Sequence, residues 1–181
     1  ILSDAGSELL MLYRVVKWGD PVLETPAAPV TNFGTPELRQ LIEDMFETMY
    51  ANKGVGLAAP QIGLSRRLAV VDTSAGEDPA MRRLLINPTI TVREGRIVDE
   101  EGCLSIPGFR ENVARAAEVV VEGKDADGGD IRLEARELMS RAFQHEIDHL
   151  DGILFLQHLS PLKRDLIKRK IKKLIKAGEW E

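Results

Sequence analysis

Hydrophobic positions along the chain follow two different periods, and their order predicts a mixed fold. Between residues 38 and 49, apolar side chains recur every three or four positions, which is the spacing of one face of an α-helix. Thr35 and Pro36 form a typical helix start, because threonine caps free N–H groups and proline suits the first turn. Gly54 should end this helix. The same period predicts two further helices, over residues 137–150 and 161–176.

Shorter apolar runs between the first two helices indicate β-strands. They cover residues 68–72, 84–90, 97–100, 119–123 and 131–135. The last two runs flank Asp127-Gly128-Gly129-Asp130, a composition typical of a hairpin turn. We therefore expect an α+β fold, with mainly antiparallel strands around a central helix and a further helix at the C-terminal end. Residues 13–181 should form one catalytic domain, and residues 1–12 an N-terminal arm or added extension.

Composition narrows the class of protein. The chain has 181 residues, of which 44% are hydrophobic and 29% charged, as in an ordinary globular domain. No apolar run approaches the ~18 residues that span a bilayer, and the acidic first residues do not resemble a signal peptide. We expect a cytoplasmic protein of bacterial type, or the mature form of an organellar one, with no membrane partner. The single cysteine, Cys103, excludes an intramolecular disulfide and serves either as a core residue or in chemistry.

The strongest chemical signal is the sequence HEIDH at residues 145–149. On a helix, His145 and His149 lie on one face, so both imidazoles can bind one metal ion. Glu146 lies beside them and can accept a proton from a water molecule at the metal. The alternative is a surface helix that matches by chance, but two of the chain's three histidines have this spacing.

Two histidines require a third protein ligand, because catalytic metal sites usually have three and keep one position open. One class of metalloprotease places a third histidine where this chain has Phe155, and another uses a downstream glutamate where it has Arg169. His158 suits packing at a helix junction. Upstream, Cys103 follows Gly102, and a thiolate is a strong ligand for zinc or ferrous iron.

Three segments together resemble the signature motifs of the peptide deformylase family: GVGLAAPQIG at 54–63, EGCLS at 101–105 and QHEIDHLDG at 144–152. The resemblance in layout extends over residues 16–176. It implies hydrolytic removal of the N-formyl group from N-formylmethionyl nascent peptides by a metal-bound water. It also implies one divalent metal ion, natively Fe2+ with Zn2+ or Ni2+ as replacements, held by Cys103, His145 and His149.

The resemblance further assigns roles around the metal. Glu146 would deprotonate the water and pass the proton to the leaving amine. The Gln61 side-chain amide and the Leu104 backbone N–H would stabilise the negative oxygen of the transition state. Gly56 would contact the substrate through its backbone. The remaining candidates, for which ordinary core or surface roles stay open, are Val55, Leu138, Arg141 and Ala142 around the methionine side chain and Arg110 against the substrate backbone.

The C-terminal segment has a charge pattern of its own. Residues 160–181 carry eight Lys or Arg against three acids, while the whole chain has a net charge of −5. An apolar stripe should pack this helix on the domain, and its cations suit RNA phosphates. In related enzymes this helix contacts the ribosome. We expect the same partner for a monomeric protein here, with a merely solvated helix face as the alternative.

Two other functions remain open on the sequence. A metallopeptidase would share the HEIDH helix, but the downstream ligand of that class is missing and EGCLS is present. A nucleic-acid-binding domain with a structural metal would use the basic tail. The acidic remainder of the chain and the open fourth metal position argue against it.

Overall fold

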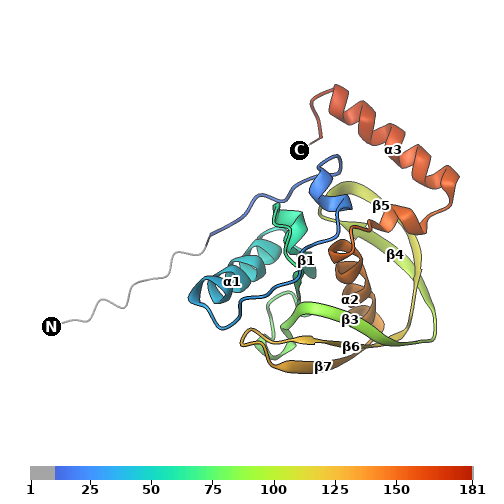
Figure 1. Cartoon of the computed structure of the whole chain (residues 1–181). Coiled ribbons are helices and arrows are strands. Elements are labelled where there is room, and N and C mark those ends of the chain that lie inside the picture. Colours follow the sequence, from blue (N-terminus) through green and yellow to red (C-terminus); the bar gives the residue numbers. More distant parts are fainter. Residues whose placement is uncertain (1–10, 181) are drawn as a thin grey trace.

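The computed structural model describes residues 11–180, and its three α-helices lie where the apolar period predicts them (Figure 1). They are α1 (Pro36–Ala51), α2 (Glu137–Leu150) and α3 (Pro161–Lys176). The Thr35 hydroxyl accepts the Leu38 N–H at 3.1 Å, which confirms the predicted cap of α1. α1 ends at Ala51, before Gly54, because Lys53 adopts a left-handed conformation with φ 57°.

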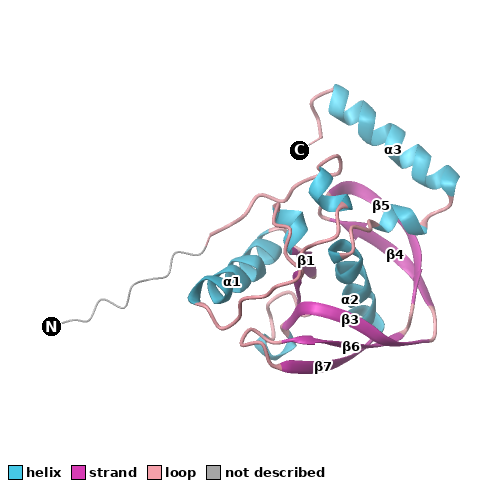
Figure 2. Cartoon of the chain, in the orientation of Figure 1, coloured by secondary structure: helices cyan, strands magenta, loops and turns pink. Residues whose placement is uncertain are grey.

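The strands form two antiparallel sheets, so the predicted α+β class is confirmed (Figure 2). The five-stranded sheet has the order β1-β2-β3-β6-β7, and the second sheet is the β4–β5 hairpin. The bounds are β1 (Gly56–Ala58), β2 (Leu68–Val71), β3 (Arg83–Glu94), β4 (Ile97–Cys103), β5 (Ile106–Arg115), β6 (Glu118–Lys124) and β7 (Asp130–Arg136). β6 and β7 pair as predicted, around a turn at residues 125–129 that begins two residues earlier than expected.

The strand prediction was wrong or incomplete at three places. β5 was not predicted, since Pro107 and Gly108 stand near its start and polar side chains interrupt any apolar alternation along it. β1 has only three residues, too few to show a period. β4 continues past residue 100, where the predicted strand ended, to Cys103, so the predicted metal ligand lies at the end of a strand.

Helix α2 lies between the two sheets and is largely buried (Figure 2). Phe143, Ile147 and Leu150 pack against the five-stranded sheet, in the same core as Val71 and Leu85. Fully burying such side chains contributes about 1.5–3 kcal/mol each. Because these residues hold one face of α2 against the sheet, the face that carries the two histidines is directed toward the hairpin.

Helix α3 lies at the periphery and packs less fully than its apolar stripe predicts (Figure 1). Ile167 and Ile171 are buried in a core with Phe155 and Ile106. By contrast, the side chains of the stripe that lie beyond this contact are exposed: Leu162, Leu166 and Ile175. Only one narrow side of the helix therefore meets the body of the protein.

Most of the predicted N-terminal arm, residues 1–10, lies outside the described residues. The first described residue, Met11, donates its N–H to Asp44 on α1 at 3.0 Å. Among the described helices, we find none with enough length and hydropathy to cross a bilayer.

Candidate active site

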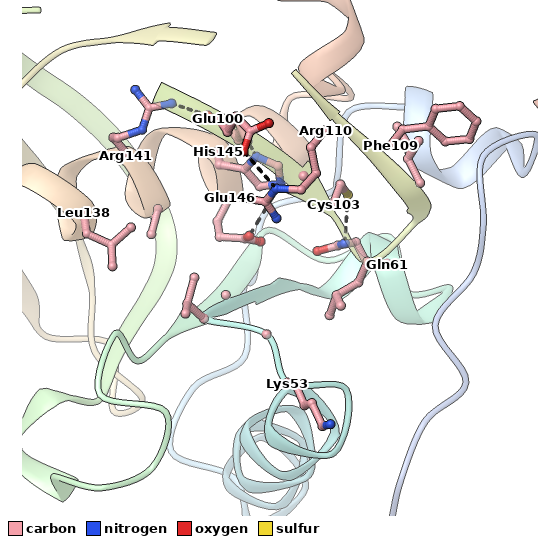
Figure 3. Close-up of a pocket in the computed structure, with 18 of the residues that line it drawn as sticks. Lys53, Gln61, Glu100, Cys103, Phe109, Arg110, Leu138, Arg141, His145 and Glu146 are labelled. Carbon is pink, nitrogen blue, oxygen red and sulfur yellow. Dashed lines mark hydrogen bonds and ion pairs between the residues drawn. The ribbon is translucent and has the colours of Figure 1, made fainter. Parts of the chain in front are cut away.

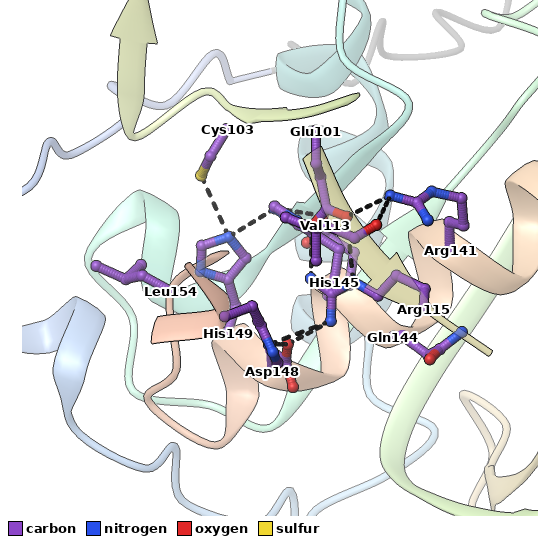
Figure 4. Close-up of polar contacts among 12 residues, drawn as sticks. Glu101, Cys103, Val113, Arg115, Arg141, Gln144, His145, Asp148, His149 and Leu154 are labelled. Atoms are coloured by element: carbon purple, nitrogen blue, oxygen red, sulfur yellow. Dashed lines mark hydrogen bonds and ion pairs between the residues drawn. The ribbon is translucent and has the colours of Figure 1, made fainter. Parts of the chain in front are cut away.

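Three side chains from two elements bring potential metal ligands together. The Cys103 thiol at the end of β4 and the imidazoles of His145 and His149 on α2 offer atoms that all lie within 4.8 Å of one another (Figure 4). His149 Nε2 lies 3.1 Å from His145 Nε2 and 3.3 Å from Cys103 Sγ. Nitrogen and sulfur ligands of one tetrahedral zinc-sized ion would lie about 3.3–3.6 Å apart, given metal–ligand bonds of about 2.0–2.3 Å. The donor set therefore fits a single divalent ion.

A buried glutamate that the sequence analysis did not single out orients the first histidine. Glu101 Oε1 lies 2.5 Å from His145 Nδ1, so Nδ1 carries the hydrogen and Nε2 faces the thiol and His149. A carboxylate in this position fixes the ring and raises the basicity of its metal-binding nitrogen. Glu101 belongs to the EGCLS segment, and its place two residues before Cys103 was the available signal.

The same carboxylate is held by two buried arginines. Arg115 donates to Glu101 from Nη2 at 2.5 Å and from Nε at 3.1 Å, and Arg141 donates from Nη2 at 3.1 Å (Figure 4). Arg115 also pairs with Asp148 at 2.6 Å. Burial acts to raise the pKa of Glu101, but the hydrogen bonds from His145 and Arg115 outweigh it and hold that pKa well below its usual value. Glu101 therefore stays ionised in the interior.

The two imidazoles differ in their affinity for a proton. Burial opposes the charge on both rings, yet the hydrogen bonds that His145 makes to Cys103 and Glu101 raise the pKa of His145. Burial and the neighbouring His145 lower the pKa of His149. A metal ion competes with protons for such nitrogens. The negative charge of Glu101 favours any positive charge, whether of a proton or of a metal ion, at the His145 ring.

Glu146 is buried beside these ligands and has an acceptor atom without a partner. No described residue makes a hydrogen bond to its Oε2, and a buried polar atom of this kind usually meets a water or a ligand. Burial raises the pKa of Glu146 to about 7. The carboxyl group packs on Gly56, where a Cβ would lie 2.7 Å from Glu146 Oε1, so only glycine fits there. With this pKa, Glu146 can both accept and release a proton near neutral pH.

Gln61 presents an amide donor to the same site. The Ala58 N–H donates to Gln61 Oε1 at 3.0 Å, which turns Nε2 toward Ser105 Oγ at 3.2 Å and Cys103 Sγ at 3.5 Å. Leu104 follows Cys103 in the turn between β4 and β5. The Gln61 amide therefore lies beside the thiol, and the other predicted oxyanion donor, the Leu104 N–H, belongs to the residue that follows Cys103.

These groups open onto a cavity of about 570 Å³ (Figure 3). Of the residues predicted for the site, only the buried His149 does not line it. The lining includes Val55, Gly56, Gln61, Cys103, Leu104, Arg110, Leu138, Arg141, Ala142, His145 and Glu146. Five side chains that the sequence analysis did not predict also line it: Lys53, Glu100, Glu101, Ile106 and Phe109.

The predicted pocket residues differ in how they face this cavity. Val55 and Leu138 are partly exposed at its rim, as apolar side chains of an open pocket would be. Arg141 turns its guanidinium away, donating to the carbonyls of Ile97 at 2.8 Å and Val113 at 3.0 Å, so its carbon chain faces the cavity. Arg110 is exposed, 3.9 Å from Glu100.

A thiol and two imidazoles around one point, with a buried carboxylate and an amide donor in an open cavity, define a metal-dependent hydrolase. Comparison with known proteins gives the particular family. The family model described as polypeptide deformylase matches residues 12–165, which is most of the chain. The chain therefore belongs to the peptide deformylase family.

Individual relatives agree with this assignment. The peptide deformylase of Acidobacterium capsulatum is 56% identical over 171 residues, which cover 94% of this chain and all of the relative. That of Thermodesulfovibrio yellowstonii is 48% identical, covering 90% of this chain and 98% of its own. A crystal structure of a peptide deformylase from Legionella pneumophila superposes with a TM-score of 0.85 at 40% identity, covering 94% of this chain and 99% of that one.

Proposed function

We propose that Cys103, His145 and His149 hold one divalent metal ion and that Glu146 moves the proton in the reaction of this family. As a family member, the chain is a metal-dependent hydrolase that removes the N-formyl group from new polypeptides. The observation that carries the assignment is the convergence of the three ligand atoms within 4.8 Å, beside a buried carboxylate. N-formylmethionyl nascent peptides are the proposed substrate.

The residues around the proposed metal ligands have different roles in the reaction. A bound ion supplies a Lewis acid that polarises the formyl carbonyl and makes water more acidic. Glu146 accepts a proton from the attacking water at its unpartnered Oε2 and returns it to the nitrogen of the leaving amine. The Gln61 amide and the Leu104 N–H donate to the formyl oxygen as it gains negative charge, and such placed donors stabilise the transition state.

The cavity offers a place for the methionine side chain. We propose that Val55, Leu138, Ala142 and the carbon chain of Arg141 contact it, because these groups form apolar lining. Gly56 brings its backbone close to Glu146, where the substrate backbone would pass. Arg110 at the exposed rim would contact the backbone beyond the methionine.

A direct assay separates this function from the alternatives. Anaerobically purified protein is given a formyl-Met peptide and its unformylated twin, and free formate and peptide fragments are both measured. We expect formate from the formylated peptide alone, with every peptide bond intact. Cleavage of an internal bond would instead indicate a metallopeptidase.

We propose Fe2+ as the native metal, with Zn2+ or Ni2+ as replacements. One thiolate and two imidazoles are ligands that suit all three ions. The test is activity after loading metal-free protein with each ion, with and without air. We expect the Fe2+ form to be the most active and to decay in air, since an iron-bound thiolate oxidises readily. Equal, air-stable activity with Zn2+ would contradict the proposal.

We also propose that the cations of α3 bind ribosomal RNA, placing a monomeric enzyme in the cytoplasm beside the nascent chain. Within residues 11–180, Lys163 is the only α3 cation in an ion pair, with Glu111 at 3.3 Å. Unpaired cations are free to displace counterions from phosphates, so binding should weaken steeply with salt. Gel filtration tests whether the protein is a monomer in solution.

Charge reversal at Lys168, Arg169, Lys172 and Lys173 tests the RNA contact, by co-sedimentation with ribosomes at two salt concentrations. We expect weaker binding and unchanged deformylation of peptides. Reversal of Arg93 and Arg96, which are exposed at the far β3–β4 turn, is the control. Unchanged sedimentation of the α3 variant would leave α3 as a packing helix with a solvated face.

A further inference from the structure

The segment after α3 turns back toward the N-terminal part of the chain (Figure 1). The Trp180 indole Nε1–H donates to the Trp18 carbonyl at 3.1 Å, joining positions 162 residues apart. The Trp180 ring also packs on Phe109, with centroids 6.3 Å apart. Because Phe109 lines the cavity, Trp180 connects the two ends of the described chain to the candidate active site.

The segment that Trp180 contacts is hydrogen-bonded to both halves of the oxyanion site. The Val16 N–H donates to the Gln61 carbonyl at 2.8 Å, and the Trp18 N–H donates to the Ser105 carbonyl at 2.8 Å. Ser105 in turn accepts the Gln61 amide at its hydroxyl. Residues 16–18 therefore fix the distance between Gln61 and the β4–β5 turn that carries Leu104.

We propose that Trp180 is a positioning residue for deformylation, which acts by holding Trp18 and Phe109 in place. This inference rests on the proposed roles of Gln61 and Leu104. Trp180 touches neither the metal ligands nor Glu146 among its described contacts, so its loss should leave metal binding intact. A loosened segment would let the two donors drift, and a misplacement of 1 Å can lower a rate by about 100-fold. Because Trp180 acts on the two donors only through Trp18 and Phe109, we expect a smaller fall in the rate, roughly tenfold.

Three variants test this proposal by steady-state kinetics on a formyl-Met peptide, with metal content and the urea unfolding midpoint measured on the same samples. Trp180→Ala removes the ring and the donor, whereas Trp180→Phe keeps a ring and loses only the N–H. Ile175→Ala is the control, because Ile175 is an exposed apolar residue of α3, five positions before Trp180. We expect Trp180→Ala to lower kcat about tenfold at full metal content, Trp180→Phe to fall between it and the wild type, and Ile175→Ala to match the wild type.

Fluorescence gives a second readout that a purely structural role would not move. The chain has two tryptophans, and both belong to this contact. Trp18→Phe leaves Trp180 as the only tryptophan, which can be excited selectively over the two tyrosines. The backbone carbonyl of residue 18, which accepts the Trp180 N–H, is kept. Addition of an unformylated Met-peptide, the reaction product, to this holoenzyme should change the Trp180 emission saturably, through Phe109.

The outcomes are distinguishable. Three results would each overturn the positioning role. The first is a wild-type kcat in Trp180→Ala, and the second is a loss of activity that only follows loss of metal or of folded protein. The third is a Trp180 emission that does not change when the product peptide is added. If the wild type and Ile175→Ala release no formate at all, the proposed function itself fails.

Discussion

Replacement of Glu101 by glutamine isolates the buried charge on which both the fold and the metal site depend. The amide has nearly the same size as the carboxylate, so packing should be preserved. It removes the ionised acceptor of His145, Arg115 and Arg141, whose atoms lie 2.5–3.1 Å from Glu101. Glu101, Arg115 and Arg141 are at most 9% exposed, so water cannot replace the lost partner.

The magnitude follows from what each partner keeps. Removing one member of a buried ion pair typically costs 3–5 kcal/mol of folding free energy. Arg115 keeps Asp148, and Arg141 keeps backbone carbonyls, including that of Val113 at 3.0 Å. We therefore expect a loss of about 3 kcal/mol, at the lower end of that range. His145 loses the charged acceptor at Nδ1, so metal affinity should fall about 10–100-fold.

Urea unfolding of the metal-free protein and competition with a chelator measure the two effects separately. The matched control is Glu100→Gln, because the neighbouring Glu100 has a side chain that is 63% exposed and lies 3.9 Å from Arg110. An exposed pair of this kind is worth about 0–1 kcal/mol, so the control should resemble the wild type. A loss below about 1 kcal/mol in Glu101→Gln, together with unchanged metal affinity, would refute the reasoning.

The remaining predictions concern the reacting groups. Glu146→Gln should keep the metal and lose nearly all turnover, since the amide cannot accept a proton; near-normal kcat in metal-loaded protein would contradict the assigned base. Cys103→Ser should lose the metal on dialysis, because a hydroxyl is a poorer ligand than a thiolate; full metal content would place the third ligand elsewhere. Gln61→Leu should retain metal and lose about 2–4 kcal/mol of transition-state stabilisation; metal loss would make Gln61 structural. The ionised Glu101 contributes stability that is fully present above its usual pKa of 4.5 and is lost as the pH falls toward its lower folded pKa. The free energy of unfolding of Glu101→Gln should therefore depend less on pH below 4.5 than that of the wild type.

Features with a local cause could be predicted from the sequence. The three helices follow from the apolar period, and the cap at Thr35 follows from its side-chain chemistry. The two histidines converge because positions four apart share a helix face, whatever surrounds the helix. Cys103 could be linked to them through elimination of other ligands and through the motif resemblance, although it lies 46 residues away from His149.

Features that depend on tertiary contacts were not accessible in this way. In the sequence Glu101 and Arg115 look like ordinary charged residues, because their burial depends on how the β4–β5 hairpin covers α2. β5 has no clear apolar alternation, because its partner strand and the helices determine which side chains are buried. The contact between Trp18 and Trp180 joins residues 162 positions apart, so no local sequence pattern predicts it.

Because α2 is buried, the ion pairs that stabilise the fold should also affect the candidate active site. A buried helix can hold two imidazoles and a carboxylate in fixed positions, but ionisable groups in an apolar interior are costly unless they are paired. Glu101, Arg115 and Asp148 supply that pairing from the hairpin and from α2 itself. The ion pairs therefore do more than stabilise the fold. They set the direction of His145 and keep negative charge beside the ligands, so a bound cation and a folded hairpin should stabilise each other.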